Sequence, residues 1–467
     1  MDNRATKFEK ACLGFCIIIL CFLALSILIR FLTREILIER LHWDNEFTRV
    51  VWLDNSEVGG SGCIEEGSEI FVDINWEKLY PFKNIENNNM VIRNRSKVSF
   101  LISLIYGIED KISSNLNDFL IGYNREVQIA KGFNAFLGVD KLSNNSDILY
   151  LDNGYLTYYE PLVGEDDIND IADNVADFAQ FLNNRDVDFL YVNAGSKVCP
   201  YDKQTMYVDS EYTNENGDAL MHALSDRKVN YLDMRDEMVG DGLDWYASYY
   251  KTDPHWKTET ALWAAKKLAE HLNAEFGYNF DILKFEPSAY DMVTTEDFWF
   301  GGQGRTVTFV NADLESYTKI IPKFETDFHI EIPARSVSND GDYEETLFNN
   351  DLYNSIFEYS KDDHLTKPSA YNSVTWRNDP LGTIRNNYKN SNDGMKILFL
   401  QDSFSWYLST YIACDIEAVD LIHPAFFTGS IRSYIEETKP DMVIMIMCER
   451  NISPVYGLTH KEVFELR

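Results

Sequence analysis

The segment KILFLQDSFSWYLSTYIAC, residues 396–414, carries the pattern that decides the fold. Residues 397–400 form a continuous apolar run, which is typical of a strand covered on both faces. The largely apolar residues 405–413 favour a helix, so Ser403 falls where a strand gives way to a helix. An α/β sheet places reactive groups at this position, at the carboxyl end of a strand. The segment therefore predicts an α/β fold with a candidate nucleophile beside its sheet.

Short apolar runs repeat this rhythm on both sides of the segment. Strands are expected at 188–193, 229–234, 416–422 and 442–447, and helices at 168–182 and 259–276. Thr258 is the expected N-cap of the last helix, and Asp152-Asn153-Gly154 is a hairpin signal. Residues 280–395 break the rhythm with many Asn, Asp, Thr and Tyr, and we interpret them as an insertion with loops and some strands. Because the runs are continuous rather than alternating, they indicate a mainly parallel sheet between helices.

The composition indicates a sizeable core inside a strongly acidic protein. Of the 467 residues, 45% are hydrophobic. The formal net charge is -33, from 75 acidic and 42 basic side chains. A surface this negative repels phosphate backbones, which argues against nucleic acid as a partner. It also makes an anionic polymer an awkward substrate, unless the site itself is locally basic.

The seven cysteines show neither a disulfide framework nor a metal-ligand spacing. Three of them lie within the N-terminal apolar run, and the others are widely separated, namely Cys63, Cys199, Cys414 and Cys448. We interpret these four as buried small hydrophobes, although disulfides among them stay open. Neither His-Glu-x-x-His nor paired Cys-x-x-Cys motifs occur, so no metal is expected. The sequence also indicates no cofactor.

The N-terminus carries a localisation signal. Residues 11–29 contain no charged side chain and are flanked by basic residues, as in a membrane-spanning helix. The alternative is a cleaved signal peptide, for which Ala24-Leu25-Ser26 is a poor cleavage site. We expect an anchor over 1–35, a linker and poorly defined region over 36–145, and an exported domain over 146–467. The domain would then lie outside the cytoplasm on a single-pass protein of the cell membrane.

A second segment, Lys251-Thr252-Asp253-Pro254-His255-Trp256, supplies the partners that a serine nucleophile needs. Pro254 favours an extended conformation for Asp253, and residues two apart in an extended segment share a side. The carboxylate can then hold one imidazole nitrogen and leave the other for the serine. If the two segments meet, they predict an enzyme that transfers or hydrolyses acyl groups. A helix N-cap for the serine and a solvated turn for the Asp-Pro pair are the alternatives.

Asp253-Pro254-His255-Trp256 resembles the Asp-His-His-Trp signature of the alginate O-acetyltransferase family of SGNH-hydrolase-like proteins, which act in polysaccharide acetylation. Other segments follow in the family's order over roughly 150–452. They are Asp152–Leu156, Asn193–Lys197, Phe300–Arg305, Gln401–Phe404, and Lys439-Pro440-Asp441 with Glu449-Arg450. Two positions depart from the family pattern. Pro254 replaces the first histidine of the signature, and Gln401 replaces a glycine, where its side chain could crowd the oxyanion pocket.

The resemblance implies an SGNH-like domain with Ser403 as nucleophile, His255 as base and Asp253 as the residue that orients it. The backbone N–H groups of Ser403 and Gly302 are candidate oxyanion donors. Lys197 and Arg305 are candidate contacts to an anionic sugar, although either could be a surface charge. Trp256 is a further candidate contact and is either a wall of the site or plain core.

The expected activity is O-acetylation of a cell-surface or secreted polysaccharide. The resemblance further implies an acetyl donor supplied by a membrane-embedded acyltransferase. A carbohydrate acetylesterase with the same three residues is the alternative enzyme. The remaining alternative is a non-catalytic glycan-binding or assembly protein, in which Ser403 would lie far from His255.

Overall fold

The computed structural model describes residues 85–86, 89–90, 148–151, 153–204, 211–388, 392–452 and Leu466. The chain divides into two units, Met1–Tyr123 and Asn124–Arg467. In the first unit, β1 (Ile85–Glu86) and β2 (Asn89–Met90) pair antiparallel. The anchor expected at 11–29 lies outside the described residues. None of the helices that are described is long and apolar enough to cross a bilayer.

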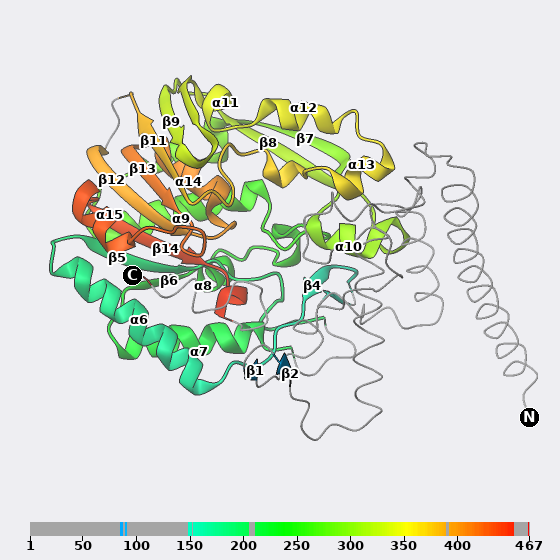
Figure 1. Ribbon diagram of the computed structural model, residues 1–467. Helices are drawn as coiled ribbons and strands as arrows, with labels where there is room; N and C mark the ends of the chain where they lie inside the picture. Colours follow the sequence, from blue (N-terminus) through cyan, green and yellow to red (C-terminus); the bar gives the residue numbers. More distant parts are fainter. Residues whose placement is uncertain are drawn as a thin grey trace, which may run out of the picture. The chain divides into compact units, whose positions relative to one another are not determined.

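Within the described part of the second unit, an eight-stranded sheet has the order β10-β9-β11-β13-β12-β14-β5-β6 (Figure 1). Its strands are β5 (Asp188–Asn193), β6 (Tyr231–Asp233), β9 (Phe328–Ile332), β10 (Val337–Gly341), β11 (Leu381–Asn386), β12 (Asn392–Gln401), β13 (Ile416–Ile422) and β14 (Met442–Met447). From β13 to β6 the pairing is parallel, whereas β11, β9 and β10 continue it antiparallel. The predicted α/β fold with a mainly parallel sheet is therefore confirmed.

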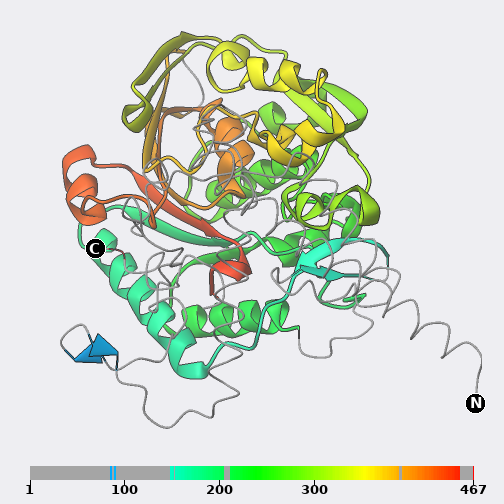
Figure 2. The same cartoon turned by 45° about the vertical axis from the view of Figure 1, so that its right-hand side comes forward.

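Helices cover both faces of this sheet, as the turned view also shows (Figure 2). On one face lie α6 (Glu165–Asn183), α7 (Thr213–Asp226) and α15 (Ile431–Thr438), which share a core with Leu398 and Leu400. On the other lie α8 (Met234–Gly240), α9 (Thr258–Glu275) and α14 (Ser405–Ala413), which share a core with Ile397 and Phe399. Alternate residues of β12 thus enter opposite cores, which explains why its apolar run is continuous.

The expected insertion, 280–395, does not stand apart from the sheet. It contributes β9, β10 and β11, which extend the sheet beyond β13. It also holds the antiparallel pair β7 (Tyr290–Trp299) and β8 (Glu315–Pro322). Its helices are α10 (Gly302–Asn311), α11 (Tyr343–Thr346), α12 (Asn350–Ile356) and α13 (Lys361–Thr366). Single turns of 3-10 helix connect the elements of the unit: η2 (Tyr246–Ser248), η3 (Ile282–Phe285), η4 (Pro287–Ala289), η5 (Pro333–Arg335), η6 (Ala370–Asn372) and η7 (Glu449–Ile452).

Most predicted elements are found within a few residues of their expected bounds, but one predicted cap is wrong. Lys257, not Thr258, is the N-cap residue of α9, and it makes no side-chain cap hydrogen bond. The Thr258 hydroxyl instead donates to the carbonyl oxygen of Thr318, at 2.6 Å. The hairpin at Asp152-Asn153-Gly154 is confirmed by the antiparallel pair β3 (Ile148–Tyr150) and β4 (Leu156–Tyr158).

The described cysteines are Cys199, Cys414 and Cys448, and all three are free thiols. Cys199 and Cys414 are buried, as predicted for small hydrophobes, whereas Cys448 is half-buried. Cys63 lies outside the described residues.

Candidate active site

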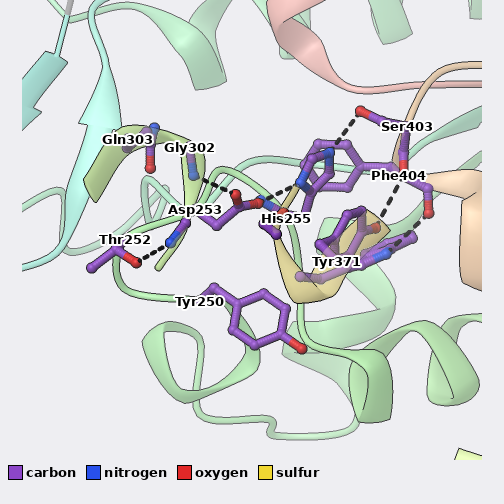
Figure 3. A network of polar contacts seen from close by, with 12 residues as sticks. Tyr250, Thr252, Asp253, His255, Gly302, Gln303, Tyr371, Ser403 and Phe404 are labelled. Carbon is purple, nitrogen blue, oxygen red and sulfur yellow. Dashed lines mark hydrogen bonds and ion pairs between the residues drawn. The ribbon is translucent and has the colours of Figure 1, made fainter. Parts of the chain in front are cut away.

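Ser403, His255 and Asp253 form one hydrogen-bonded chain (Figure 3). Ser403 follows the carboxyl end of β12, while Asp253 and His255 lie in the loop that leads into α9. The Ser403 Oγ lies 2.6 Å from Nε2 of His255, and Nδ1 of His255 lies 2.5 Å from Oδ1 of Asp253. A proton on Nδ1 satisfies both contacts, because Nε2 then accepts the serine hydroxyl. The structure thus brings the three predicted residues together.

Asp253 is held as an ionised group. It is buried, with 4% of its surface exposed, and burial alone raises its pKa. The charge of His255, the hydrogen bonds from His255 and Gly302, and the charge of Lys197 outweigh burial, so the pKa of Asp253 falls below its usual value. The carboxylate can therefore stabilise a positively charged His255.

The glycine-rich segment 301–304 packs directly on the loop that carries Asp253. The Gly302 N–H donates to Oδ2 of Asp253 at 2.8 Å, and the Gly304 N–H donates to the Thr252 carbonyl at 2.8 Å. A Cβ on Gly301 would lie 2.4 Å from that carbonyl oxygen, so only glycine permits this approach. Because the Gly302 N–H is bonded to Asp253, its expected role as an oxyanion donor is not supported.

Ser403 retains an open donor. Its own backbone N–H donates to no acceptor among the described residues. The residue is half-buried and stands just before α14, where backbone N–H groups favour negative charge. It therefore remains the better candidate for the oxyanion donor.

Lys197 is a buried residue that is hydrogen-bonded within the protein, and not the expected substrate contact. Only 1% of its surface is exposed. Its Nζ donates to the carbonyl of Tyr250 at 2.8 Å, to that of Lys251 at 3.3 Å, and to Oε1 of Gln303 at 2.8 Å. All three donors of the ammonium group are used within the protein. Lys197 therefore fastens the loop before Asp253 to the glycine-rich segment.

Trp256 belongs to the core, which is the second of its two expected places. Its side chain is fully buried, and its Nε1 donates to the carbonyl of Phe404 at 3.1 Å. This bond ties the loop of His255 to the turn of Ser403. Of the three expected substrate contacts, Arg305 alone is half-buried and has no hydrogen-bond or ion-pair partner for its side chain among the described residues.

An aromatic wall around His255 was not expected from the sequence. The ring of Tyr371 stacks on His255, with centroids 4.0 Å apart, and its hydroxyl donates to the Ser403 carbonyl at 3.1 Å. Phe404 and Trp406 lie 5.0 and 6.2 Å from the imidazole. Tyr371 comes from η6 in the insertion, far from either motif, and no pattern marks it. Trp406 could have been predicted near the site, because it follows Ser403 by three residues, about one helical turn.

Asp402 fixes the turn that presents Ser403. Its Oδ2 accepts the Cys448 N–H and the Asn451 amide, each at 2.7 Å, and its Oδ1 accepts the Phe404 N–H at 2.9 Å. The side chain of Gln401 is buried and its Oε1 accepts the Ser405 hydroxyl at 2.7 Å. Gln401 is therefore engaged at the start of α14, which argues against the expected crowding of the oxyanion pocket.

Comparison with known proteins finds a family model that matches part of the chain. Residues 149–297 match the family model for the SGNH hydrolase-like domain of the acetyltransferase AlgX. This confirms the resemblance to AlgX-type proteins over a segment that includes Asp253 and His255 but ends before Ser403. No curated protein sequence matches the chain.

Solved structures share the fold at low sequence identity. PatB1 from Bacillus cereus, in a structure with a sulfonyl adduct, is 16% identical with a TM-score of 0.54, over 69% of this chain and 99% of that chain. A DHHW family protein from Eubacterium siraeum is 15% identical with a TM-score of 0.48, over 69% and 95%. AlgX from Pseudomonas aeruginosa is 11% identical with a TM-score of 0.36, over 68% and 65%. At this identity, the PatB1 likeness shows a shared α/β fold.

Proposed function

We propose that this protein is an O-acetyltransferase that acetylates hydroxyl groups of a cell-surface or secreted polysaccharide. The observation that carries the proposal is the hydrogen-bonded chain from Ser403 through His255 to Asp253. The match to the AlgX-type acetyltransferase domain supports acyl transfer as the reaction class. A non-catalytic relative was expected to have Ser403 far from His255. The two side chains lie 2.6 Å apart, which supports an enzyme instead.

In the first half-reaction, Ser403 Oγ attacks the carbonyl carbon of an acetyl donor while His255 Nε2 takes the hydroxyl proton. The Ser403 N–H stabilises the negative charge that develops on the carbonyl oxygen, and Asp253 stabilises the imidazolium. The donor's leaving group departs with the proton from His255. An acetyl ester on Ser403 remains.

In the second half-reaction, a sugar hydroxyl gives its proton to His255 Nε2 and attacks the acetyl carbonyl. The tetrahedral intermediate breaks the bond to Ser403 Oγ, which regains a proton from His255. The acetyl group leaves on the sugar, and the three residues return to their starting state. An acetylesterase would follow the same steps with water in place of the sugar hydroxyl.

The proposal places the domain outside the cytoplasm. Residues 11–29 would hold the protein at the cell membrane, close to a membrane-embedded acyltransferase that supplies the acetyl group. The polysaccharide would be the acceptor. No cofactor takes part in the proposed steps.

The test is the acetyl content of the surface polysaccharide in cells that carry Ser403→Ala. Ser338→Ala is the matched control, since Ser338 is an exposed serine of β10 away from both motifs. We expect Ser403→Ala to abolish this chain's share of acetylation and Ser338→Ala to leave it unchanged. Unchanged acetylation in Ser403→Ala contradicts the proposal. If the purified chain releases only free acetate when donor and oligosaccharide are both present, the esterase is correct.

A further inference from the structure

Glu315 binds the loop 250–255, which carries the acid and the base of the proposed triad. The residues of this loop form no helix or strand, so their backbone groups need partners from elsewhere in the chain. Glu315 is half-buried, and its carboxylate accepts the N–H groups of Lys251 and Thr252, the second at 2.7 Å. A carboxylate suits this position, because it has two acceptor oxygens and its charge strengthens each hydrogen bond.

Lys197 binds the same two peptide units at their other end. Its Nζ donates to the carbonyl oxygens of Tyr250 and Lys251, at 2.8 and 3.3 Å. The peptide units 250–251 and 251–252 thus each have an N–H bound to Glu315 and a C=O bound to Lys197. The two opposite charges match the direction of the peptide dipoles, which stabilises this orientation of the loop.

Thr252, the residue before Asp253, is bound at every polar atom. It is buried, with 2% of its surface exposed. Its N–H and its hydroxyl donate to Glu315, and the hydroxyl accepts the Gly301 N–H at 3.0 Å. Its carbonyl accepts the Gly304 N–H at 2.8 Å. The backbone that leads into Asp253 is therefore fixed by Glu315 together with the glycine-rich segment.

One end of the β7–β8 pair supplies both of these contacts. Glu315 is the first residue of β8 and lies opposite Trp299, the last residue of β7. The chain runs from Trp299 into the glycine-rich segment, where the Gly302 N–H donates to Oδ2 of Asp253 at 2.8 Å (Figure 3). This end of the pair therefore holds the side chain of Asp253 through Gly302, and the backbone before it through Glu315.

β8 also binds the far end of the loop. The Thr258 hydroxyl donates to the carbonyl oxygen of Thr318 at 2.6 Å, and the Thr318 hydroxyl donates to the carboxylate of Glu259. Glu315 and Thr318 stand three residues apart on β8. One strand of the insertion thus contacts the chain on both sides of the triad's acid and base.

We propose that Glu315 is a positioning residue for acetyl transfer, which sets the Asp253 carboxylate against His255 through the backbone of Lys251 and Thr252. This inference rests on the proposed function and adds a residue to its site. Glu315 takes no part in the bond changes of either half-reaction. Its effect comes from placement, because a shift of about 1 Å at a reacting group can lower a rate about a hundredfold.

The first test is the steady-state kinetics of Glu315→Gln in the full chain, with an activated acetyl ester. An amide has one acceptor oxygen, so at least one of the N–H groups of Lys251 and Thr252 loses its acceptor. We expect kcat to fall by about tenfold to a hundredfold and KM to change by less than about threefold, because Glu315 acts on placement and not on ester binding.

Glu417→Gln is the matched control for this substitution. Glu417 is a half-buried glutamate near the amino end of β13. Because β13 runs parallel to β12, this residue lies toward the end of the sheet opposite to Ser403. The control should keep the wild-type kcat.

The second test asks whether Glu315 acts through Asp253. If it does, Glu315→Gln should lower kcat in the wild type but by less than about threefold in an Asp253→Asn background, because the positioned carboxylate is already gone. A side chain that only stabilises the fold would lower kcat by the same factor in both backgrounds.

The third test needs no substrate. The proton on Nδ1 of His255 that bonds to Asp253 should give a low-field proton resonance in NMR spectra of the full chain, and Asp253→Asn should remove it. Glu315→Gln should move this resonance upfield, because the carboxylate no longer lies in line with the imidazole. Glu417→Gln should leave the resonance in place.

The inference is overturned if folded Glu315→Gln keeps the wild-type kcat or the wild-type resonance, if its loss is the same in both backgrounds, or if Glu417→Gln has equal effects. Where Glu315→Gln does not fold, Thr252→Val decides, since it removes the hydroxyl that binds Glu315 at almost unchanged volume. An unmoved resonance in Thr252→Val then overturns the inference. Failure of the proposed function differs: unchanged acetylation in Ser403→Ala would remove the enzyme, while the resonance still reports whether Glu315 places Asp253.

Discussion

The ring of Tyr371 lies flat on the imidazole of His255, with centroids 4.0 Å apart and planes inclined by 9°. The same side chain donates from its hydroxyl to the Ser403 carbonyl oxygen at 3.1 Å. One residue of the insertion therefore touches two members of the proposed triad. Stacking limits the rotation of the imidazole, and the hydrogen bond fixes the turn that carries the serine.

Replacing Tyr371 separates these two contacts. Tyr371→Phe keeps the stacked ring and loses the hydrogen bond, so we expect kcat/KM for acetyl transfer to fall by about tenfold or less. Tyr371→Leu loses both contacts and should fall further, mainly in kcat, because the imidazole is no longer held in the plane that reaches Ser403. Steady-state kinetics with an activated acetyl ester measure both. Equal activity of Tyr371→Leu and the wild type would show that the stacking has no positioning role.

Asp253→Asn tests the orienting carboxylate. The amide cannot stabilise an imidazolium, and its NH₂ group favours the wrong tautomer of His255. We expect kcat to fall by about a thousandfold or more, as for the equivalent change in serine hydrolases. Asp342→Asn, at the exposed cap of α11, should leave kcat unchanged. A loss of less than tenfold in Asp253→Asn would mean that His255 is oriented by other groups.

Asp402→Asn tests the support of the serine turn. An asparagine supplies one acceptor oxygen, whereas Asp402 uses two oxygens for three donors. At least one buried donor is then left without an acceptor, at a cost of about 1–3 kcal/mol in the free energy of unfolding. Chemical denaturation measures this loss, and kcat should fall with it because Ser403 shifts. An unchanged unfolding free energy would contradict the support role.

Lys197→Met tests the buried lysine through the pH dependence of stability. Burial lowers the pKa of Lys197 to about 7, against an ordinary value of 10.5. Between these pH values the unfolded chain binds the proton more tightly, so the stability contributed by this group rises as pH increases from about 7 to about 10.5. The wild type should therefore gain Tm relative to Lys197→Met across this window. At pH 7 the variant should be less stable, since three oxygen acceptors lose their donor.

Lys396→Met is the control for this comparison, because Lys396 is an exposed lysine of β12. Its Tm should follow that of the wild type over the whole window. A constant difference between the wild type and Lys197→Met from pH 7 to pH 10.5 would contradict the lowered pKa.

Local elements could be predicted because their residues carry a local pattern. The strands at 188–193, 416–422 and 442–447 and the helix at 405–413 have the expected bounds, since each is a largely apolar run in the sequence. Pairing across the chain carries no such pattern. The antiparallel strands of the insertion alternate polar and apolar residues over few positions, which does not say that they extend the main sheet beyond β13.

The site could be predicted where reactive residue types stand in motifs that follow the family's order. It could not be predicted where burial determines the role of a side chain. Asp253, His255 and Ser403 stand in motifs, so their meeting could be expected. Lys197 was expected either at a substrate or on the surface, since lysines are rarely buried, yet three acceptors hold it inside. Tyr371 contributes through stacking on His255 and one hydrogen bond to a backbone carbonyl, and one tyrosine in a tyrosine-rich insertion gives no sequence signal.

The most direct test of the account is the site of acetyl attachment after the full chain is incubated with an activated acetyl ester and then digested. Mass spectrometry should find one acetyl group on the peptide that contains Ser403, and none there in Ser403→Ala. Addition of an acceptor oligosaccharide should remove this acetyl group and place it on the sugar. A wild-type peptide without acetyl on Ser403, while the sugar still becomes acetylated, would contradict the account.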